Sequence, residues 1–314
     1  MKPKYIEISN GPLRARLLAK GAALGGLWHS AVSGSLVLGY TDDTDLGYMG
    51  ALVGPVANRV GGAVIEIDGT RWQMHANEAD NCLHSGDQGI HARVWEVADQ
   101  SASSVTFSLT LQHGECGLPG LRRISACYTL KQSSLRLDIT ANSDRKTVMN
   151  IAHHPYWNLA AKGDIRSHDL LVHADTYLPV KADKIPTGEQ ACLEGLGLAG
   201  RTSTPLVNVE PMDHNLCLAS TRSDTLRPAA CLTGPNGMQL TISTTEPGLQ
   251  VYDGAGLSEQ ETPNNIGAPV GPYAGIAMEP QGWPDAPAQD GFPSIMLHPD
   301  DNYRQSTLYV LKSA

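Results

Sequence analysis

Two histidines and two aromatic residues stand together in residues 150–159, which read Asn-Ile-Ala-His-His-Pro-Tyr-Trp-Asn-Leu. An imidazole titrates near neutral pH, so His153 or His154 could donate or accept a proton in a reaction. Tyr156 and Trp157 offer flat faces that can stack on the C–H face of a sugar ring. Because neighbouring side chains of a strand point to opposite faces, only one of the two histidines is expected to face any given cavity.

A carboxylate candidate, Glu279, follows the apolar-leaning run 275–278. A glutamate in such a place can lose part of its hydration, which raises its pKa toward the range of a general base. The prolines that follow predict a rigid loop directly after it (Pro280, Pro284, Pro287 and Pro293). The alternative from this segment alone is a strand-end glutamate with its carboxylate in solvent.

Residues 54–60 and 81–86 hold side chains suited to sugar hydroxyls: Asn58, Arg59 and His84. Arginine presents a rigid fork of donors, and a neutral imidazole offers one donor and one acceptor. Sugar hydroxyls both donate and accept hydrogen bonds, so such groups would suit them. From spacing alone, Arg59 could equally be a surface ion-pair residue and His84 a satisfied loop histidine.

The run Asp213-His214-Asn215 is expected to lie in a loop, where an Asx-turn is the plainer interpretation. The histidines do not predict a metal site. Such a site needs three or four ligands in good geometry, and the sequence contains no H-x-H, H-E-x-x-H or Cys/His cluster. No metal is therefore expected.

Composition narrows the partners of the chain. Its 314 residues carry a net charge of −9, and no basic run exceeds the pair Arg122-Arg123. A protein that binds nucleic acid or an anionic membrane needs a concentrated basic face, so neither partner is expected. No apolar stretch approaches the roughly 20 residues that span a bilayer. The N-terminus lacks the apolar core of a secretory signal and the six cysteines are scattered, which predicts reduced thiols and a cytoplasmic location.

The elements that must position these residues are strands. Residues 64–67 and 70–74 flank Asp68-Gly69, and residues 230–232 and 238–242 flank Pro235-Asn236-Gly237, both of which predict hairpins. Period-two alternation over 105–111 and 135–139 predicts strands with one buried face.

Glycine and proline, 32 and 20 in number, punctuate the whole chain as turn residues do. We therefore expect an all-β protein, a single large antiparallel β-sandwich domain over residues 1–314. The weakest candidate boundary is the Gly/Ala/Leu-rich stretch 191–203. No feature of the sequence indicates an oligomeric state.

At these residues the chain resembles the aldose 1-epimerase (galactose mutarotase) family over nearly its whole length. The matching motifs occur in the family's order: G-x-x-A-N-R at 54–59 with L-H-G-G at 83–86, N-L-T-N-H-S-Y-F-N-L at 150–159, Y-x-P-V-x-x-x-x-I-P-T-G-E at 177–189, D-H at 213–214, P-G-x-Q-x-Y at 247–252, and E-T-Q-x-x-P-D-A-P-N-Q at 279–289. The departures are Ser85 for a glycine, His153 for an asparagine, Pro155 for a small residue and Pro280 for a threonine. His153 and Pro155 are expected to reshape the pocket wall.

The resemblance implies a β-supersandwich, no metal or organic cofactor, and interconversion of the α and β anomers of a free aldose, a small-molecule sugar. It implies His154 as general acid toward the ring oxygen and Glu279 as general base toward the anomeric hydroxyl, so Glu279 is expected to be ionised and His154 protonated. The residues expected to hold the sugar hydroxyls are Asn58, Arg59, His84, Tyr156, Asp213 and Gln250.

Three alternatives remain beside this interpretation. A glycoside hydrolase would use two carboxylates, such as Glu279 and Asp213. A non-catalytic carbohydrate-binding protein would not need both Glu279 and His154. A hexose-phosphate epimerase would need several basic residues around the phosphate, and only Arg59 and Arg93 lie near the motifs.

Overall fold

The computed structural model describes residues 5–39, 47–259, 264–266 and 269–313. Its longest strands are β10 (Ser104–Leu111), β11 (Arg122–Lys131), β12 (Ser134–Ser143) and β26 (Tyr303–Lys312). Along β12, Leu135, Leu137 and Ile139 are buried and the residues between them are more exposed. The alternation in the sequence therefore appears as strands with one face in the core.

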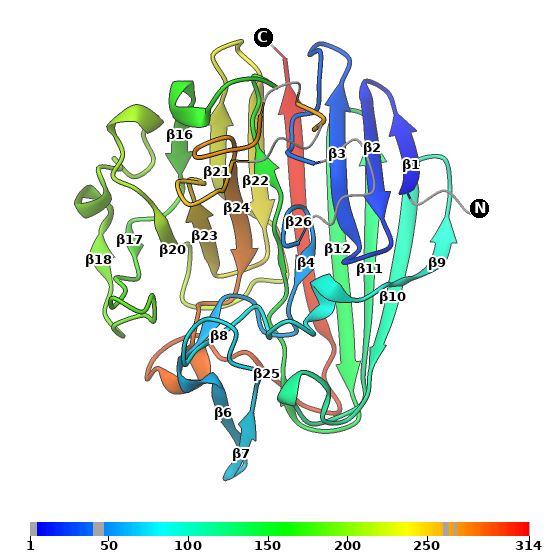
Figure 1. Ribbon diagram of the computed structural model, residues 1–314, viewed down its shortest axis with the longest axis vertical. Coiled ribbons are helices and arrows are strands. Elements are labelled where there is room, and N and C mark those ends of the chain that lie inside the picture. The colour runs from blue at the N-terminus through cyan, green and yellow to red at the C-terminus, as the bar shows by residue number, and fades with distance from the viewer. Residues whose placement is uncertain (1–4, 40–46, 260–263, 267–268, 314) are drawn as a thin grey trace.

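The larger layer is a nine-stranded antiparallel sheet in the order β19-β16-β21-β22-β26-β12-β11-β10-β9. The four long strands form its centre and its right half in Figure 1. The remaining strands are β9 (Glu96–Gln100), β16 (Asp169–Val172), β19 (Thr204–Pro205), β21 (Arg227–Thr233) and β22 (Gln239–Thr244).

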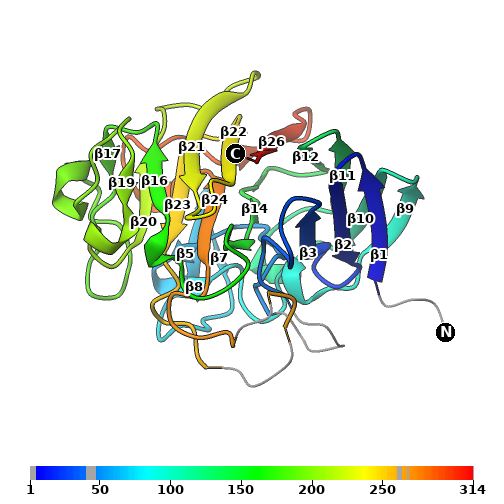
Figure 2. The ribbon, with the colours of Figure 1, turned by 90° about the horizontal axis from the view of Figure 1, so that it is seen from above.

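The opposing layer consists of two antiparallel sheets. One has six strands in the order β15-β24-β23-β20-β17-β18, and the other is β1-β2-β3. Figure 2 shows this layer facing the nine-stranded sheet. The strand bounds are β15 (Tyr156–Trp157), β24 (Ile276–Gln281), β23 (Gly248–Tyr252), β20 (Asp213–Cys217), β17 (Thr176–Tyr177), β18 (Ala191–Cys192), β1 (Tyr5–Asn10), β2 (Leu13–Leu18) and β3 (Ala23–His29).

One hydrophobic core fills the space between the layers. It includes Leu137 of the nine-stranded sheet, Leu249 of the six-stranded sheet and Leu17 of the three-stranded sheet, all at most 2% exposed. Sheet-on-sheet packing of this kind buries the facing sides of the two layers. The prediction of a large all-β antiparallel sandwich is confirmed.

Short strand pairs and 3-10 helices make up the rest of the regular structure in the described residues. The pairs are β4 (Leu52–Val53) with β14 (Ala152–His153), β5 (Arg59–Val60) with β8 (Cys82–Leu83), β6 (Val64–Ile67) with β7 (Thr70–Gln73), and β13 (Thr147–Val148) with β25 (Met296–Leu297). The helices are η1 (Gly61–Ala63), η2 (Ile90–Ala92), η3 (Glu115–Gly117), η4 (Ile165–Ser167), η5 (Leu193–Leu196), η6 (Leu206–Asn208) and η7 (Ala286–Ala288). None of the helices in the described part of the chain has the length and apolar character needed to cross a membrane.

Both predicted hairpins are present. β6 and β7 pair around Asp68 and Gly69, whose φ angles of 50° and 73° are those a two-residue hairpin turn needs. β21 and β22 pair across the turn that contains Gly237. All six cysteines are free, as the sequence predicted.

Two local predictions were wrong. Asp213 does not lie in a loop but begins β20, where it pairs with Tyr252, so the ladder replaces the expected Asx-turn. Pro280 does not begin a loop but lies inside β24 opposite Leu249. β15 pairs with β24 only at Ile276 and Ala277, so Pro280 lies where β24 has a strand on one side only, and such an edge tolerates a residue without an N–H.

Truncating the core at the middle of the largest sheet should destabilise the fold strongly. Leu137→Ala removes a buried side chain that two layers surround, and we expect a loss of about 2–5 kcal/mol in the free energy of unfolding. Denaturant titration measures it. The control Val97→Ala, on a side chain that is 45% exposed, should change stability by about 0.5 kcal/mol or less; equal effects of the two substitutions would contradict the assignment of the core.

Candidate active site

A cavity of 240 Å³ brings all of the predicted site residues together. Its lining consists of Tyr48, Asn58, Arg59, Leu83, His84, His154, Tyr156, Asp213, Gln250, Tyr252 and Glu279. These residues come from segments that are far apart in the sequence and meet on one face of the six-stranded sheet. A volume below the roughly 300–1,000 Å³ of pockets for drug-sized ligands suits a single sugar ring.

Three adjacent strands supply the acidic side of the cavity. In the register of β20, β23 and β24, Gln250 lies opposite both Asn215 and Glu279. Directly paired residues point to the same face of a sheet, and diagonal neighbours are within reach of long side chains. Accordingly Gln250 Nε2 donates to Asp213 Oδ1 at 2.7 Å. The sheet register, rather than sequence proximity, places Asp213, Gln250 and Glu279 side by side.

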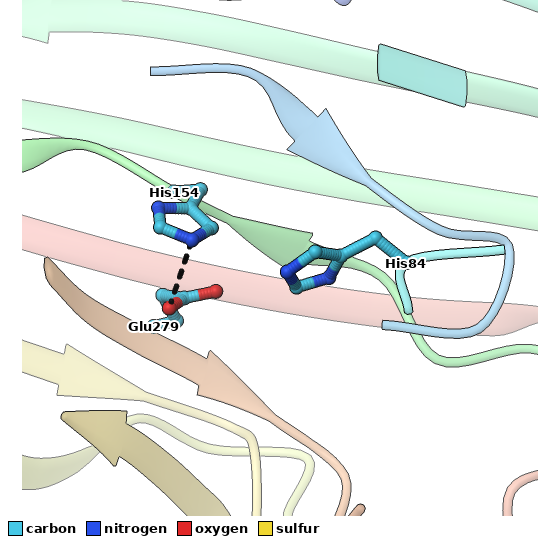
Figure 3. Close-up of side chains that lie close together, drawn as sticks. All are labelled: His84, His154 and Glu279. Carbon is cyan, nitrogen blue, oxygen red and sulfur yellow. Dashed lines mark ion pairs between the residues drawn. The ribbon is translucent and has the colours of Figure 1, made fainter. Parts of the chain in front are cut away.

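Glu279 and His154 are in contact at the base of the cavity. His154 Nε2 lies 3.4 Å from Glu279 Oε1, and the two residues are 5% and 2% exposed. Figure 3 shows the imidazole directly above the carboxylate. The two groups therefore adjoin each other rather than lying on opposite sides of a sugar ring. This arrangement suits two oxygens bonded to one carbon, such as the anomeric hydroxyl and the ring oxygen at C1.

Burial controls the charge of this pair. It raises the pKa of Glu279 well above its usual range, and the carboxylate of Asp213 raises it further, against a smaller opposite effect of Arg59. Burial also lowers the pKa of His154 to about 4. Glu279 Oε2 has no hydrogen-bond partner among the described residues, which suits a neutral carboxyl better than an anion. In the empty site burial thus favours the neutral form of each group, against the expected ionised Glu279 and protonated His154.

Asn58 and His84 lock each other in a strained loop geometry. Both have positive φ, 63° and 52°, a conformation that costs free energy in residues other than glycine. His84 N donates to Asn58 O, and Asn58 N donates to His84 Nδ1, each at 3.0 Å. Ser85, where the family has glycine, also has a positive φ of 66°. Its hydroxyl accepts from Val56 N at 2.8 Å and donates to Val56 O at 3.1 Å, which offsets that strain.

This loop fixes the tautomer of His84. Burial, followed by the charges of His154 and Arg59, lowers the pKa of His84 well below its usual value, so the ring is neutral. A neutral imidazole carries one proton, and Nδ1 accepts the N–H of Asn58, so the proton resides on Nε2. Figure 3 shows His84 turned toward the pair. His84 therefore presents a hydrogen-bond donor to the cavity.

The same tautomer weighs against a metal. His84, His154 and Glu279 place ligand-type atoms within 4.8 Å of one another, a cluster that the sequence spacing did not reveal. With its proton on Nε2, however, His84 offers no lone pair to the cavity, and moving the proton to Nδ1 would set it against the N–H of Asn58. Two ligands remain, fewer than the three or four of zinc sites. The expectation of a metal-free site stays a prediction.

Arg59 is held by two acidic residues. Its Nε and Nη2 donate to Glu78 at 2.6 and 3.0 Å, and Nη1 lies 3.4 Å from Asp213 Oδ2. Burial opposes the charge of Arg59, but these partners together raise its pKa above the ordinary value. The cation is therefore neutralised before any ligand enters, and the remaining carboxylate gives this side of the cavity a negative charge.

Three contributing residues were missed by the sequence analysis. Glu78 orients Arg59 from a turn with no distinguishing sequence signal. Tyr48 packs its ring against His84 at a centroid distance of 4.7 Å, and Tyr252 lines the cavity beside Gln250. The P-G-x-Q-x-Y motif contains Tyr252, and period two from Gln250 could have found it.

Some neighbours of the site do not line it. His153 points away from His154, with Nδ1 3.1 Å from the hydroxyl of Tyr309, so the prediction that one of the two histidines faces the cavity is confirmed. Trp157, expected as a stacking surface, is fully buried against Tyr309. His153 and Pro155 are both absent from the cavity lining, so they do not form its wall as expected.

Known proteins with similar sequences identify the family. A sequence model described as aldose 1-epimerase matches residues 4–310. The chain belongs to the aldose 1-epimerase family. Galactose mutarotase from Homo sapiens is 33% identical over 275 residues, which cover 85% of this chain and 80% of that protein. Aldose 1-epimerase from Haemophilus influenzae is 31% identical over 258 residues, 78% of this chain and 74% of that protein.

Solved structures agree with this family. A GalM/aldose epimerase homologue from C. elegans has a TM-score of 0.91 at 28% identity, over 99% of both chains. The predicted activity of this epimerase, isomerisation between sugar anomers, is confirmed at the level of the family, and neither a glycoside hydrolase nor a non-catalytic sugar-binding protein is favoured.

The pKa directions of the pair predict its protonation in the empty epimerase. Because the pKa of His154 is lowered to about 4 and that of Glu279 is raised, the two groups hold one shared proton, mainly on Glu279, at any pH above about 4 until Glu279 itself loses it. In ¹⁵N NMR spectra, assigned with His154→Asn, the ring of His154 should stay neutral as the pH falls from about 8 to about 5. Protonation of that ring within this interval would contradict the assignment.

Proposed function

We propose that the epimerase opens and closes the sugar ring with Glu279 as base toward the anomeric hydroxyl and His154 as acid toward the ring oxygen. The observation that carries this proposal is the 3.4 Å contact of two buried proton-transfer groups inside one sugar-sized cavity. Two such groups contribute roughly 10²–10⁴-fold each. That is sufficient for a reaction that already proceeds in water.

The reaction needs one proton that is shared by the pair. Ring opening moves the anomeric hydroxyl proton to Glu279 while His154 delivers its proton to the ring oxygen. The open aldehyde turns about the C1–C2 bond, and the two transfers then reverse on the other face of the carbonyl. The reactive arrangement, ionised Glu279 with protonated His154, differs from the resting one only in the place of the shared proton. A sugar hydroxyl that donates to Glu279 stabilises its ionised form.

The remaining predicted residues would hold the other hydroxyls. Nη1 of Arg59 and Nε2 of His84 supply donors, and Asp213 supplies an acceptor. Asn58, Tyr156 and Gln250 add groups that are able to donate or accept. Their convergence on the cavity that contains the pair supports these roles.

A neutral free aldose is the substrate that this electrostatic setting favours. Glu78 and Asp213 outnumber Arg59, so a phosphate or carboxylate on the sugar would meet net negative charge. This supports an unphosphorylated sugar over a hexose phosphate. The name galactose mutarotase, carried by several similar proteins, makes galactose the first sugar to test.

Two wider features belong to the same proposal. We propose a single domain over residues 1–314, supported by a core cluster that extends from Ile8 to Leu311. We also propose a cytoplasmic location, supported by six free cysteines.

Removing either member of the pair should abolish most of the activity. Glu279→Gln keeps the shape but cannot accept the proton, and His154→Asn removes the acid. Each should lower the rate of anomer exchange by roughly 10²–10⁴-fold, measured by NMR exchange spectroscopy on galactose. The control Glu66→Gln changes an exposed glutamate outside the cavity and should leave the rate unchanged. An unchanged rate in pure, folded Glu279→Gln would refute the assignment.

The charge balance around Arg59 predicts discrimination against phosphorylated sugars. The kcat/KM for galactose 6-phosphate should be roughly tenfold or more below that for galactose, because like charges oppose binding. Glu78→Gln removes one negative partner of Arg59 and should reduce the difference in kcat/KM between the two sugars. Equal kcat/KM for the two sugars in the unmodified protein would show that the negative charge does not govern selection.

A further inference from the structure

We infer that two buried hydrogen-bond bridges set the separation of Glu279 and His154, and that Asn150 and Tyr303 are positioning residues for the reaction. The inference rests on the proposed roles of the pair. Backbone hydrogen bonds between strands do not set this separation, because β15 pairs with β24 only at Ile276 and Ala277 and not at Glu279. The segment that carries His154 instead pairs with β4 through Ala152 and His153.

The first bridge joins Asn150 to Gly282. Asn150 Oδ1 accepts from Gly282 N at 2.7 Å, and Asn150 Nδ2 donates to Gly282 O at 3.3 Å. The side-chain amide thus takes the place of a neighbouring strand and satisfies both backbone groups of Gly282. Asn150 is 1% exposed. The fit is close, since a Cβ on Gly282 would lie 2.9 Å from Ile295 Cγ2.

The second bridge comes from the opposite sheet. Tyr303 Oη accepts from Ile151 N at 3.1 Å and donates to Gln305 Oε1 at 3.0 Å. Gln305 Nε2 then donates to Pro280 O at 3.0 Å. Tyr303 and Gln305 are 3% and 4% exposed. A continuous chain of hydrogen bonds therefore links the residue after Glu279 to a residue three positions before His154.

The ring of Tyr303 is itself held in place. The guanidinium of Arg222 lies over it, with Cζ 4.4 Å from the ring centroid. Glu246, with no exposed side-chain surface, accepts from Arg222 Nε and Nη2 at 2.8 and 2.9 Å. A cation held by two charge-assisted hydrogen bonds limits the movement of the ring beneath it.

These bridges affect the distance between Glu279 and His154 and not the sugar-binding residues. They attach to the chain one and three residues beyond Glu279, at Pro280 within β24 and at Gly282 just after it. Arg59 and His84 are held separately by Glu78 and Asn58. Loss of the bridges should therefore displace the pair and leave the sugar contacts in place. A displacement of about 1 Å can cost roughly 10²-fold in rate.

The test compares Tyr303→Phe, Asn150→Ala and the double variant in galactose exchange. We expect each single variant to lower kcat by roughly tenfold with KM within about twofold. Because either bridge alone still restrains β24, the double variant should lower kcat by more than the product of the single effects. The pH dependence of kcat should also change, since a longer distance between Glu279 and His154 weakens the coupling between their protonation equilibria.

The matched control is Tyr128→Phe, which also removes one buried hydroxyl, here bonded to Ala22 O at 2.9 Å. It should lower the thermal midpoint without lowering kcat. If Tyr303→Phe does not fold, Gln305→Glu tests the same bridge, because it keeps the acceptor for Tyr303 and loses the donor to Pro280. The inference is overturned if kcat is unchanged in the folded bridge variants. It is also overturned if these variants alter kcat and KM only to the same extent as the control does. If Glu279→Gln is also fully active, the proposed function fails as well.

Discussion

A buried carboxyl and a buried imidazole in contact with each other are the constraint on which the rest of this structure depends. In water, Glu279 and His154 would each take the charge set by the pH. Inside the cavity, burial opposes both charges, and the 3.4 Å contact lets one proton serve two groups. Such a pair is useful only if its separation is held, because proton transfer requires hydrogen-bond distance.

The two-layer fold meets that requirement by holding the two residues on different elements. Register in β20, β23 and β24 presents Asp213, Gln250 and Glu279 to one face, whereas His154 arrives on a segment paired mainly with β4. The nine-stranded sheet contacts both segments, because Tyr303 and Gln305 of β26 hydrogen-bond to Ile151 and Pro280. A large core therefore does more than stabilise the fold, since it supports two segments that have few backbone bonds to each other.

Much of this arrangement could be predicted from the sequence. Hairpins at Asp68-Gly69 and at Gly237 follow from turn chemistry, and alternation correctly separates His153 from His154. The family motifs predict which residues line the cavity. Local patterns fail where a distant strand decides the outcome. Asp213 pairs in a ladder instead of forming an Asx-turn.

Electrostatics and aromatic contacts were harder to predict. Trp157 lies in the core, and burial shifts the pKa of Glu279 upward and that of His154 downward, against the expected charges, because no sequence pattern reports the depth of burial. Glu78 carries no motif, although it orients Arg59 and offsets the charge of its guanidinium. Its role depends on a contact with Arg59, the first residue of β5, which only the three-dimensional structure brings close to it.

The seclusion of the pair has a consequence for turnover. In the proposed reaction each transfer by Glu279 is matched by one by His154, so the total number of protons on the pair and the sugar stays constant from the closed ring through the aldehyde to the other anomer. The enzyme has no need to draw protons from the medium or to return them between cycles. Free sugars in solution exchange their anomers with help from dissolved acids and bases, whereas the proposed reaction uses one proton that stays on the protein and its substrate.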